Sequence, residues 1–250
     1  MPDLSKRVRA LPFSATRKYL PSAKALQAKG VFVHELNIGQ PDLPISSDFY
    51  RHVRDIDAPV LAYAPSAGYE PLRQAISRYY LRLGIQVDAV ETLVSYGASE
   101  ALTMLFDVLC DPGDEIVVFE PFYANYCSMA EIQGVQLRAV STRLEEGFAL
   151  PTLDLIAQAI TPRTKAILFS NPSNPTGSVM SREDLAVLVH LARERNIFLI
   201  ADEVYREFVF EGERATSLLE MEGTRDVAIV VDSVSKRYSA CGARIGWMAT

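Results

Sequence analysis

The stretch Asp232-Ser-Val-Ser-Lys-Arg-Tyr-Ser-Ala-Cys-Gly-Ala-Arg-Ile-Gly246 follows an apolar, strand-like run near Ala228. Lys236 stands just after this strand, and Arg244 follows eight residues later between two glycines. An amine made less basic by burial or by a nearby cation can condense with a carbonyl, and Arg244 supplies a cation that can also bind phosphate. A phosphorylated aldehyde would suit such a site. An arbitrary lysine is more often a solvated loop residue, so this interpretation depends on three other segments.

The motif Asn171-Pro-Ser-Asn-Pro-Thr-Gly177 lies between an apolar run, residues 166–169, and a helix-like stretch, residues 181–195. It therefore sits at the carboxyl end of a strand, where open α/β sheets bind ligands. Two prolines and a glycine fix a loop that can hold the Asn174 amide toward a ligand. Taken alone, the motif is also consistent with a rigid turn.

Two more segments place polar groups after apolar runs. In Ile197-Phe-Leu-Ile-Ala-Asp-Glu-Val-Tyr205 the apolar run ends at Asp202, and Tyr205 follows three residues later. Asp202 in this place could equally cap the next helix. Thr92-Leu-Val-Ser-Tyr-Gly-Ala-Ser-Glu-Ala-Leu102 reads as a strand, a small-residue turn and a helix start, whose backbone N–H groups attract phosphate. This last signal is weak by itself.

In this order and spacing, the four segments resemble the fold-type I pyridoxal-phosphate enzymes, and within them the class I and II aminotransferases that include aspartate aminotransferase. The combination of Asn-Pro-x-Asn-Pro-Thr-Gly, Asp-Glu-x-Tyr, Ser-x-Ser-Lys and Gly-x-Arg-x-Gly is specific to that family. The resemblance covers nearly the whole chain, because residues 36–42 look like the family's early substrate loop and residues 63–73 like its next landmark.

The resemblance implies catalytic roles for Lys236, Asp202 and Tyr205. Lys236 would hold pyridoxal 5'-phosphate as a Schiff base and later move a proton between substrate and cofactor. Asp202 would face the pyridine nitrogen and keep the ring protonated, so that the ring can accept electrons. Asn174 and Tyr205 would donate hydrogen bonds to the phenolic oxygen of the cofactor.

Other cofactor-binding residues follow from the same resemblance. Arg244, Ser233 and the helix start at Ala98 and Ser99 would hold the phosphate. Tyr123 falls where the family places an aromatic residue stacked on the cofactor ring, although a core tyrosine is nearly as good an interpretation.

The resemblance also implies contacts with substrate and with a second subunit. Gly39 would meet the substrate carboxylate through its backbone, since a residue without a side chain permits close approach. Asn174 would contribute to the same substrate site. Tyr63 would reach the phosphate of the neighbouring subunit, which makes a homodimer part of the expectation.

Apolar strand-like runs alternate with helix-like segments along the chain, which predicts an α/β fold with a mainly parallel sheet of the seven-stranded type and helices on both faces. The strands are expected near residues 92, 116, 135, 166, 197 and 228, with a last strand in residues 245–250. We expect residues 1–45 to form an N-terminal arm and the first part of a small second domain. Residues 46–250 would form the large cofactor-binding domain, with the C-terminal domain of the family apparently missing.

The composition argues against a nucleic-acid-binding or a membrane protein. The chain has 250 residues, of which 49% are hydrophobic and 22% charged, enough to bury a sizeable core. A net charge of -6 argues against a general affinity for nucleic acid, and no stretch is long and apolar enough for a membrane span. Three cysteines and three histidines show no metal spacing and favour a reducing, cytoplasmic location.

The resemblance implies an aminotransferase that moves an amino group from an amino acid to a 2-oxo acid. Two alternatives stay open: a carbon–sulfur lyase on the same scaffold, and a non-catalytic cofactor-binding module with the same fold. The amino-acid donor and the arginine that pairs with the substrate α-carboxylate are not identified by the sequence.

Overall fold

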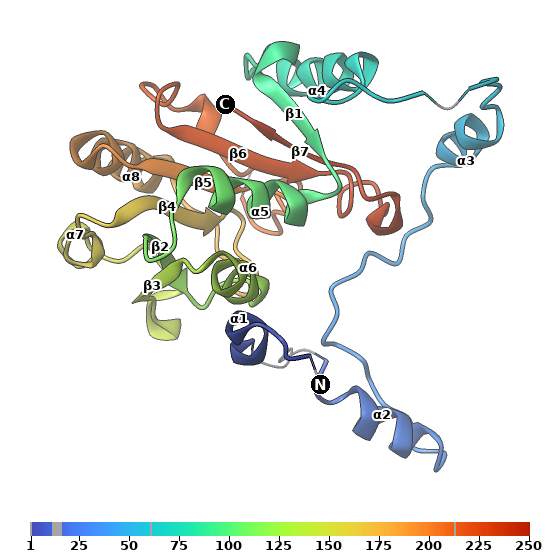
Figure 1. Cartoon of the computed structure of the whole chain (residues 1–250), viewed down its shortest axis with the longest axis horizontal. Coiled ribbons are helices and arrows are strands. Elements are labelled where there is room, and N and C mark those ends of the chain that lie inside the picture. The colour runs from blue at the N-terminus through green and yellow to red at the C-terminus, as the bar shows by residue number, and fades with distance from the viewer. Residues whose placement is uncertain (1, 12–16, 61, 213) are drawn as a thin grey trace.

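The computed structural model describes residues 2–11, 17–60, 62–212 and 214–250. Seven strands form one sheet: β1 (Thr92–Ser95), β2 (Glu115–Glu120), β3 (Gln136–Ser141), β4 (Thr164–Ser170), β5 (Phe198–Asp202), β6 (Ala228–Ser233) and β7 (Gly246–Ala249). Their order across the sheet is β1-β7-β6-β5-β4-β2-β3. Helices cover both faces of this sheet (Figure 1), so the predicted α/β fold is confirmed.

The sheet is parallel from β3 across to β6. β7 runs antiparallel to both of its neighbours, β1 and β6. The direction reverses because the chain returns from β6 through residues 234–245 without an α-helical crossover, and a parallel return needs such a crossover. The carboxyl ends of β4, β5 and β6 therefore meet at one edge of the sheet.

Consecutive residues of the central strands face opposite helical layers. Leu168 packs with α5 (Ala98–Leu109) and α6 (Asn125–Gln133), whereas Ile167 packs with α7 (Leu153–Ala159) and α8 (Arg182–Arg195). Both side chains have no exposed area. A strand that is buried on both faces needs an unbroken apolar run, and this explains why the sequence shows no polar alternation there.

Local signals fix the ends of the helices. Ser181 accepts a hydrogen bond from the backbone N–H of Asp184, and Asp184 accepts one from Ser181, so α8 begins with a reciprocal cap. Asn196 ends this helix in the left-handed conformation, at φ 51°. Four short 3-10 helices complete the structure: η1 (Ala89–Glu91), η2 (Leu144–Glu146), η3 (Leu218–Glu220) and η4 (Cys241–Ala243).

Four further helices precede the sheet: α1 (Lys6–Ala10), α2 (Leu20–Gln27), α3 (Ser47–Arg54) and α4 (Glu70–Arg82). The sequence analysis did not predict them. Ile76 and Tyr80 of α4 pack against Trp247 of β7, and the Trp247 indole donates a 3.0 Å hydrogen bond to the Tyr80 hydroxyl. α2 and α3 lie away from the sheet (Figure 1) and contain no buried residue. Within the described residues, no helix combines the length and apolar character that crossing a bilayer requires.

Candidate functional site

A cavity of about 240 Å³ opens at the carboxyl ends of β4, β5 and β6. It is lined by most of the residues that the sequence analysis singled out: Ala98, Ser99, Tyr123, Asn174, Asp202, Tyr205, Ser233, Lys236 and Arg244. These residues come from segments far apart in the sequence, and the parallel strand order brings them to one edge. The location agrees with the rule that open α/β sheets bind ligands at carboxyl ends.

Asp202 is the last residue of β5, and its side chain is buried. It accepts hydrogen bonds from the Tyr126 hydroxyl at 2.8 Å and from the Val204 backbone N–H at 3.3 Å. Among the described residues, no cation pairs with it. Burial raises the pKa of Asp202 to about 6, although both hydrogen bonds act in the opposite direction. A carboxylate in such surroundings fits a ligand that carries positive charge, such as a protonated ring nitrogen.

Lys236 points toward the amino-terminal part of the chain. Its Nζ donates a hydrogen bond to the backbone oxygen of Gly39 and lies 5.7 Å from the centre of the Tyr205 ring. A Cβ atom on Gly39 would lie 3.7 Å from the Tyr205 hydroxyl. Gly39 does not line the cavity itself, but its backbone lies at the amine of the candidate nucleophile.

The opposite side of the cavity is suited to an anion. α5 begins after Gly97, and the N–H groups of its first turn have no partner within the helix. The Arg244 guanidinium donates to the backbone oxygens of Cys241 at 2.8 Å and Tyr96 at 3.4 Å. A Cβ atom on Gly97 would clash with this guanidinium, so glycine lets the cation approach the helix start. A helix N-terminus beside an arginine is a phosphate-binding arrangement.

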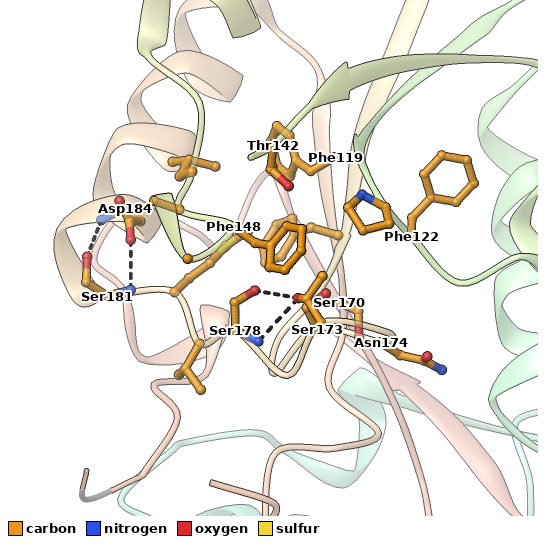
Figure 2. Close-up of a pocket in the computed structure, with 18 of the residues that line it drawn as sticks. Phe119, Phe122, Thr142, Phe148, Ser170, Ser173, Asn174, Ser178, Ser181 and Asp184 are labelled. Carbon is orange, nitrogen blue, oxygen red and sulfur yellow. Dashed lines mark hydrogen bonds between the residues drawn. The ribbon is translucent and has the colours of Figure 1, made fainter. Parts of the chain in front are cut away.

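The two asparagines of the Asn-Pro-x-Asn-Pro motif have different surroundings. Asn171 is buried, donates to the Thr216 backbone oxygen at 3.2 Å and accepts from the Met180 N–H at 3.0 Å. These bonds hold the loop in place. Asn174 lines the cavity and also a neighbouring pocket of about 280 Å³, where Figure 2 shows it on the same loop as Ser173. That second pocket has no lysine or arginine in its lining, so we place the candidate site in the first one.

Of the two predicted tyrosines Tyr123 and Tyr63, the first lines the cavity and the second does not. Tyr123 lines the cavity, and its ring meets that of Tyr126 edge-on, with 5.5 Å between the ring centres. Its hydroxyl accepts a hydrogen bond from the Asn125 side chain. Tyr63 is fully exposed and is not part of the lining. Its contact with a neighbouring subunit stays a prediction.

Sequence reasoning missed several residues of the site. Tyr126 holds Asp202, although its segment was considered for Tyr123 alone. Ser235 and Cys241 line the cavity, and the Cys241 thiol donates to the Ser235 backbone oxygen at 3.2 Å. Both lie between Ser233 and Arg244 in the sequence, and this position within the motif could have predicted that they line the cavity. Leu102, Ser170 and Val204 complete the lining.

The donor set fits pyridoxal 5'-phosphate. A buried carboxylate without a cationic partner suits a protonated ring nitrogen, and the start of α5 with Arg244 suits a phosphate. Lys236 supplies an amine in the same cavity. The fit rests on the chemistry of the residues that line the cavity.

Comparison with known proteins agrees with this chemistry. Residues 33–250 match the family model described as aminotransferase class I and II. The aspartate/prephenate aminotransferase of Thermus thermophilus is 37% identical over 254 residues, which cover 99% of this chain and 64% of the relative. A structure of aspartate aminotransferase from Thermotoga maritima matches with a TM-score of 0.92 at 33% identity, covering 99% of this chain and 66% of that one.

A solved structure of an aminotransferase named for another amino acid shares the same fold. A structure of alanine aminotransferase from Pyrococcus furiosus matches with a TM-score of 0.90 at 34% identity, covering 99% of this chain and 63% of that one. The chain spans about 64% of the length of the Thermus relative. The family match includes every segment that lines the cavity. The chain therefore belongs to the class I and II aminotransferases, a family whose members depend on pyridoxal 5'-phosphate.

Proposed function

We propose that this protein is a pyridoxal-phosphate-dependent aminotransferase that moves an amino group from an amino acid to a 2-oxo acid. The observation that carries the proposal is the arrangement of Lys236, Asp202 and Arg244 around one cavity. The amine, the buried carboxylate and the cation are the three groups that the reactive aldehyde, the ring nitrogen and the phosphate of one cofactor would require. Membership of the family supports the same function.

In the proposed reaction, Lys236 Nζ would hold the cofactor, and its free amine would take the proton from the α-carbon of the substrate. When bound, pyridoxal phosphate supplies an electron sink for the pair that this proton leaves behind. The Asp202 carboxylate would stabilise a proton on the ring nitrogen of the bound cofactor. Arg244, Ser233 and the first N–H groups of α5 bind the phosphate and so orient the ring.

The remaining predicted residues have roles in orientation. Burial raises the pKa of Tyr205, so its phenol keeps its proton at neutral pH and can donate to the phenolic oxygen of the cofactor. We propose that Asn174 donates to the same oxygen and takes part in substrate binding, and that Tyr123 stacks on the ring. The backbone of Gly39 would meet the substrate carboxylate.

The proposal includes a homodimer in which Tyr63 reaches the neighbouring site, which its full exposure here supports. It also includes a division into an arm with part of a small domain, residues 1–45, and a large domain, residues 46–250. α3 begins at Ser47, close to this boundary. A cytoplasmic location is supported by three free cysteines, Cys110, Cys127 and Cys241.

The proposal is tested by borohydride trapping. The full chain is mixed with pyridoxal phosphate, reduced, digested and mapped by mass spectrometry, with Lys236→Ala as the variant and Lys165→Ala as the control. We expect one reduced adduct, on Lys236, which persists in the Lys165 variant. An adduct on other lysines alone would contradict the assignment. Product analysis with a panel of amino acids then separates the reaction classes, since ammonia and pyruvate from a thioether amino acid would indicate a lyase.

A further inference from the structure

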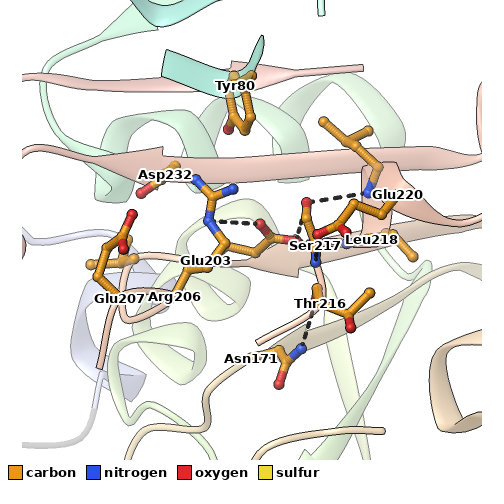
Figure 3. A network of polar contacts seen from close by, with 12 residues as sticks. Tyr80, Asn171, Glu203, Arg206, Glu207, Thr216, Ser217, Leu218, Glu220 and Asp232 are labelled. Atoms are coloured by element: carbon orange, nitrogen blue, oxygen red, sulfur yellow. Dashed lines mark hydrogen bonds and ion pairs between the residues drawn. The ribbon is translucent and has the colours of Figure 1, made fainter. Parts of the chain in front are cut away.

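The residues next to those of the site form a second buried polar group on the other side of the same strand ends. Glu203 follows Asp202, Arg206 follows Tyr205, Asp232 precedes Ser233, and Arg237 follows Lys236. The side chains of this second set do not line the cavity and form ion pairs with one another. Figure 3 shows Glu203, Arg206 and Asp232 of this set. We call this set the ion cluster: Glu203, Arg206, Asp232 and Arg237.

Asp232 is the centre of the ion cluster. Arg237 Nη2 lies 2.5 Å from Asp232 Oδ1 and 2.6 Å from Oδ2, so one nitrogen bridges both oxygens. Arg206 Nη2 donates to Asp232 Oδ2 at 2.9 Å, and its Nε lies 3.5 Å from Glu203 Oε2. All four side chains are at most 4% exposed. Within the cluster two carboxylates face two guanidiniums, and Glu207 outside it lies 3.6 Å from Arg237 Nη1.

Neighbouring elements enclose the cluster. Glu203 accepts hydrogen bonds from the Ser217 hydroxyl at 2.9 Å and from the Leu218 backbone N–H at 2.8 Å. The Tyr79 ring of α4 lies 4.6 Å from the Arg237 guanidinium and 5.2 Å from that of Arg206. Within the described residues, several guanidinium N–H groups have no hydrogen-bond partner, and aromatic rings cover the guanidiniums. Cation–π contacts compensate in part for the missing bonds.

A buried ion cluster adds little net stability, but removing one partner leaves another charge buried and unpaired. The cluster is therefore rigid, since none of its members can move away alone without that penalty. It joins the loop after β5, which carries Tyr205, to the loop after β6, which carries Lys236. Each loop is fixed by the residue that directly adjoins the candidate catalytic one.

From this arrangement we infer that Arg237 is a positioning residue, which fixes the backbone of Lys236 through its ion pair with Asp232. The inference rests on the proposed function of Lys236 and adds a second requirement to it. Lysine cannot replace arginine fully here, because an ammonium lacks the planar group that lies over the Tyr79 ring. The position of Lys236 would then depend on the Arg237 guanidinium, which does not line the cavity.

Amide hydrogen exchange of the full chain without cofactor tests the inference, read on peptides covering residues 234–240. In Arg237→Met we expect exchange of this segment to become about tenfold faster, because the loop opens locally more often. Arg237→Lys should give an intermediate rate. The matched control is Arg163→Met, which removes the arginine that pairs with buried Glu115 at the other edge of the sheet. Unchanged exchange in Arg237→Met, or equal acceleration in the control, would overturn the inference.

Two further measurements keep the test decisive. If Arg237→Met does not fold, the double variant Asp232→Asn/Arg237→Met restores charge balance and should still show faster exchange at residues 234–240. In a turnover assay, Arg237→Met should lower kcat about tenfold with KM nearly unchanged, because positioning acts on the reacting group and not on substrate binding. Failure of wild-type protein to form the Lys236 adduct would refute the proposed function, while the exchange comparison would still decide the role of Arg237.

Discussion

Glu115 and Asp202 are both buried carboxylates of the central sheet, at opposite edges and in opposite surroundings. Glu115 begins β2 and accepts hydrogen bonds from Thr161 at 2.7 Å and from Arg163 at 2.5 Å. Burial acts to raise the pKa of Glu115, but these bonds outweigh it and lower the pKa. Asp202 ends β5 without a cationic partner among the described residues, and its pKa is raised to about 6. At the amino ends of the strands an arginine pairs with the carboxylate, whereas the described residues offer no cation to Asp202 at the carboxyl ends, as we expect for a residue that meets a ligand.

The largest expected effect is the loss of activity when Lys236, at the carboxyl ends of the strands, is replaced, compared with Lys165 at the amino ends. Lys236→Ala should reduce aminotransfer by at least about 10³-fold, because it removes both the attachment point and the base. Lys165 lies near the start of β4 and is 3.5 Å from Asp114, so Lys165→Ala should leave the rate within about twofold. Steady-state rates with a saturating amino donor measure the difference. Similar losses of rate in the two variants would contradict the assignment of the active site to the carboxyl ends of the strands.

The second prediction concerns pH. The folded-state pKa of Asp202 is raised above its ordinary 3.8, so its stabilising contribution is complete below pH 3.8 and is lost as pH rises through about 6. Between pH 4 and 7 the cofactor-free protein should lose about 2 kcal/mol relative to Asp202→Asn, because part of the full effect is already lost at pH 4. Urea unfolding of both proteins across this range gives the difference, in which other titrating groups cancel. Parallel stability curves would show that Asp202 has no raised pKa.

Two glycines give the third comparison. Gly97, after β1, and Gly113, before β2, both have positive φ, at 81° and 98°. Gly97→Ala and Gly113→Ala should each cost about 1 kcal/mol of stability through backbone strain. A Cβ at Gly97 also displaces Arg244, whereas one at Gly113 meets nothing within 4 Å. Pyridoxal-phosphate titration should therefore show about tenfold weaker binding for Gly97→Ala alone. Equal affinities would argue against a phosphate at Arg244.

The smallest effect is expected from Glu115→Gln. Its partner Arg163 is 61% exposed, so the ion pair is partly screened and its loss should cost about 1 kcal/mol in the free energy of unfolding. Cofactor affinity should not change, since Glu115 lies at the far edge of the sheet. Thermal unfolding and cofactor titration of the same preparation check both statements. A weakened cofactor affinity would show that the two edges are coupled.

Much of the sheet was predictable because its central strands carry unbroken apolar runs. β4 and β5 pack on both faces, so residues such as Leu168 and Ile200 leave a plain signal in the sequence. α2 and α3 contain no buried residue, and the α2 sequence shows no marked apolar face. α3 is amphipathic, but its eight residues are too short a segment for that pattern to predict a helix alone. The antiparallel direction of β7 depends on a connection whose path is set by tertiary contacts, and the strand run itself carries no sign of direction.

The candidate site was predictable where one short segment holds both the strand end and the polar residue. Asp202, Asn174 and Lys236 each satisfy this condition, and the structure brings them to one cavity. Tyr126 bonds to Asp202 from a helix 76 residues away in the sequence, and no local pattern links the two. The contact of Arg206 with Asp232 spans 26 residues and was missed for the same reason.

The position of β7 has a consequence for the order in which this chain assembles. β1 precedes β2 in the sequence, yet within the described part of the chain its strand partner is β7, the seventh strand in chain order. β2 to β6 can pair with one another as they leave the ribosome, while β1 and α4 must wait until Trp247 and Ala249 arrive. Because this closure joins residues about 155 positions apart, it is a slow, long-range step. Arg244 and Gly246 reach the backbone of Gly97 in the same event, so the candidate anion-binding part of the cavity forms only after β2 to β6 have paired.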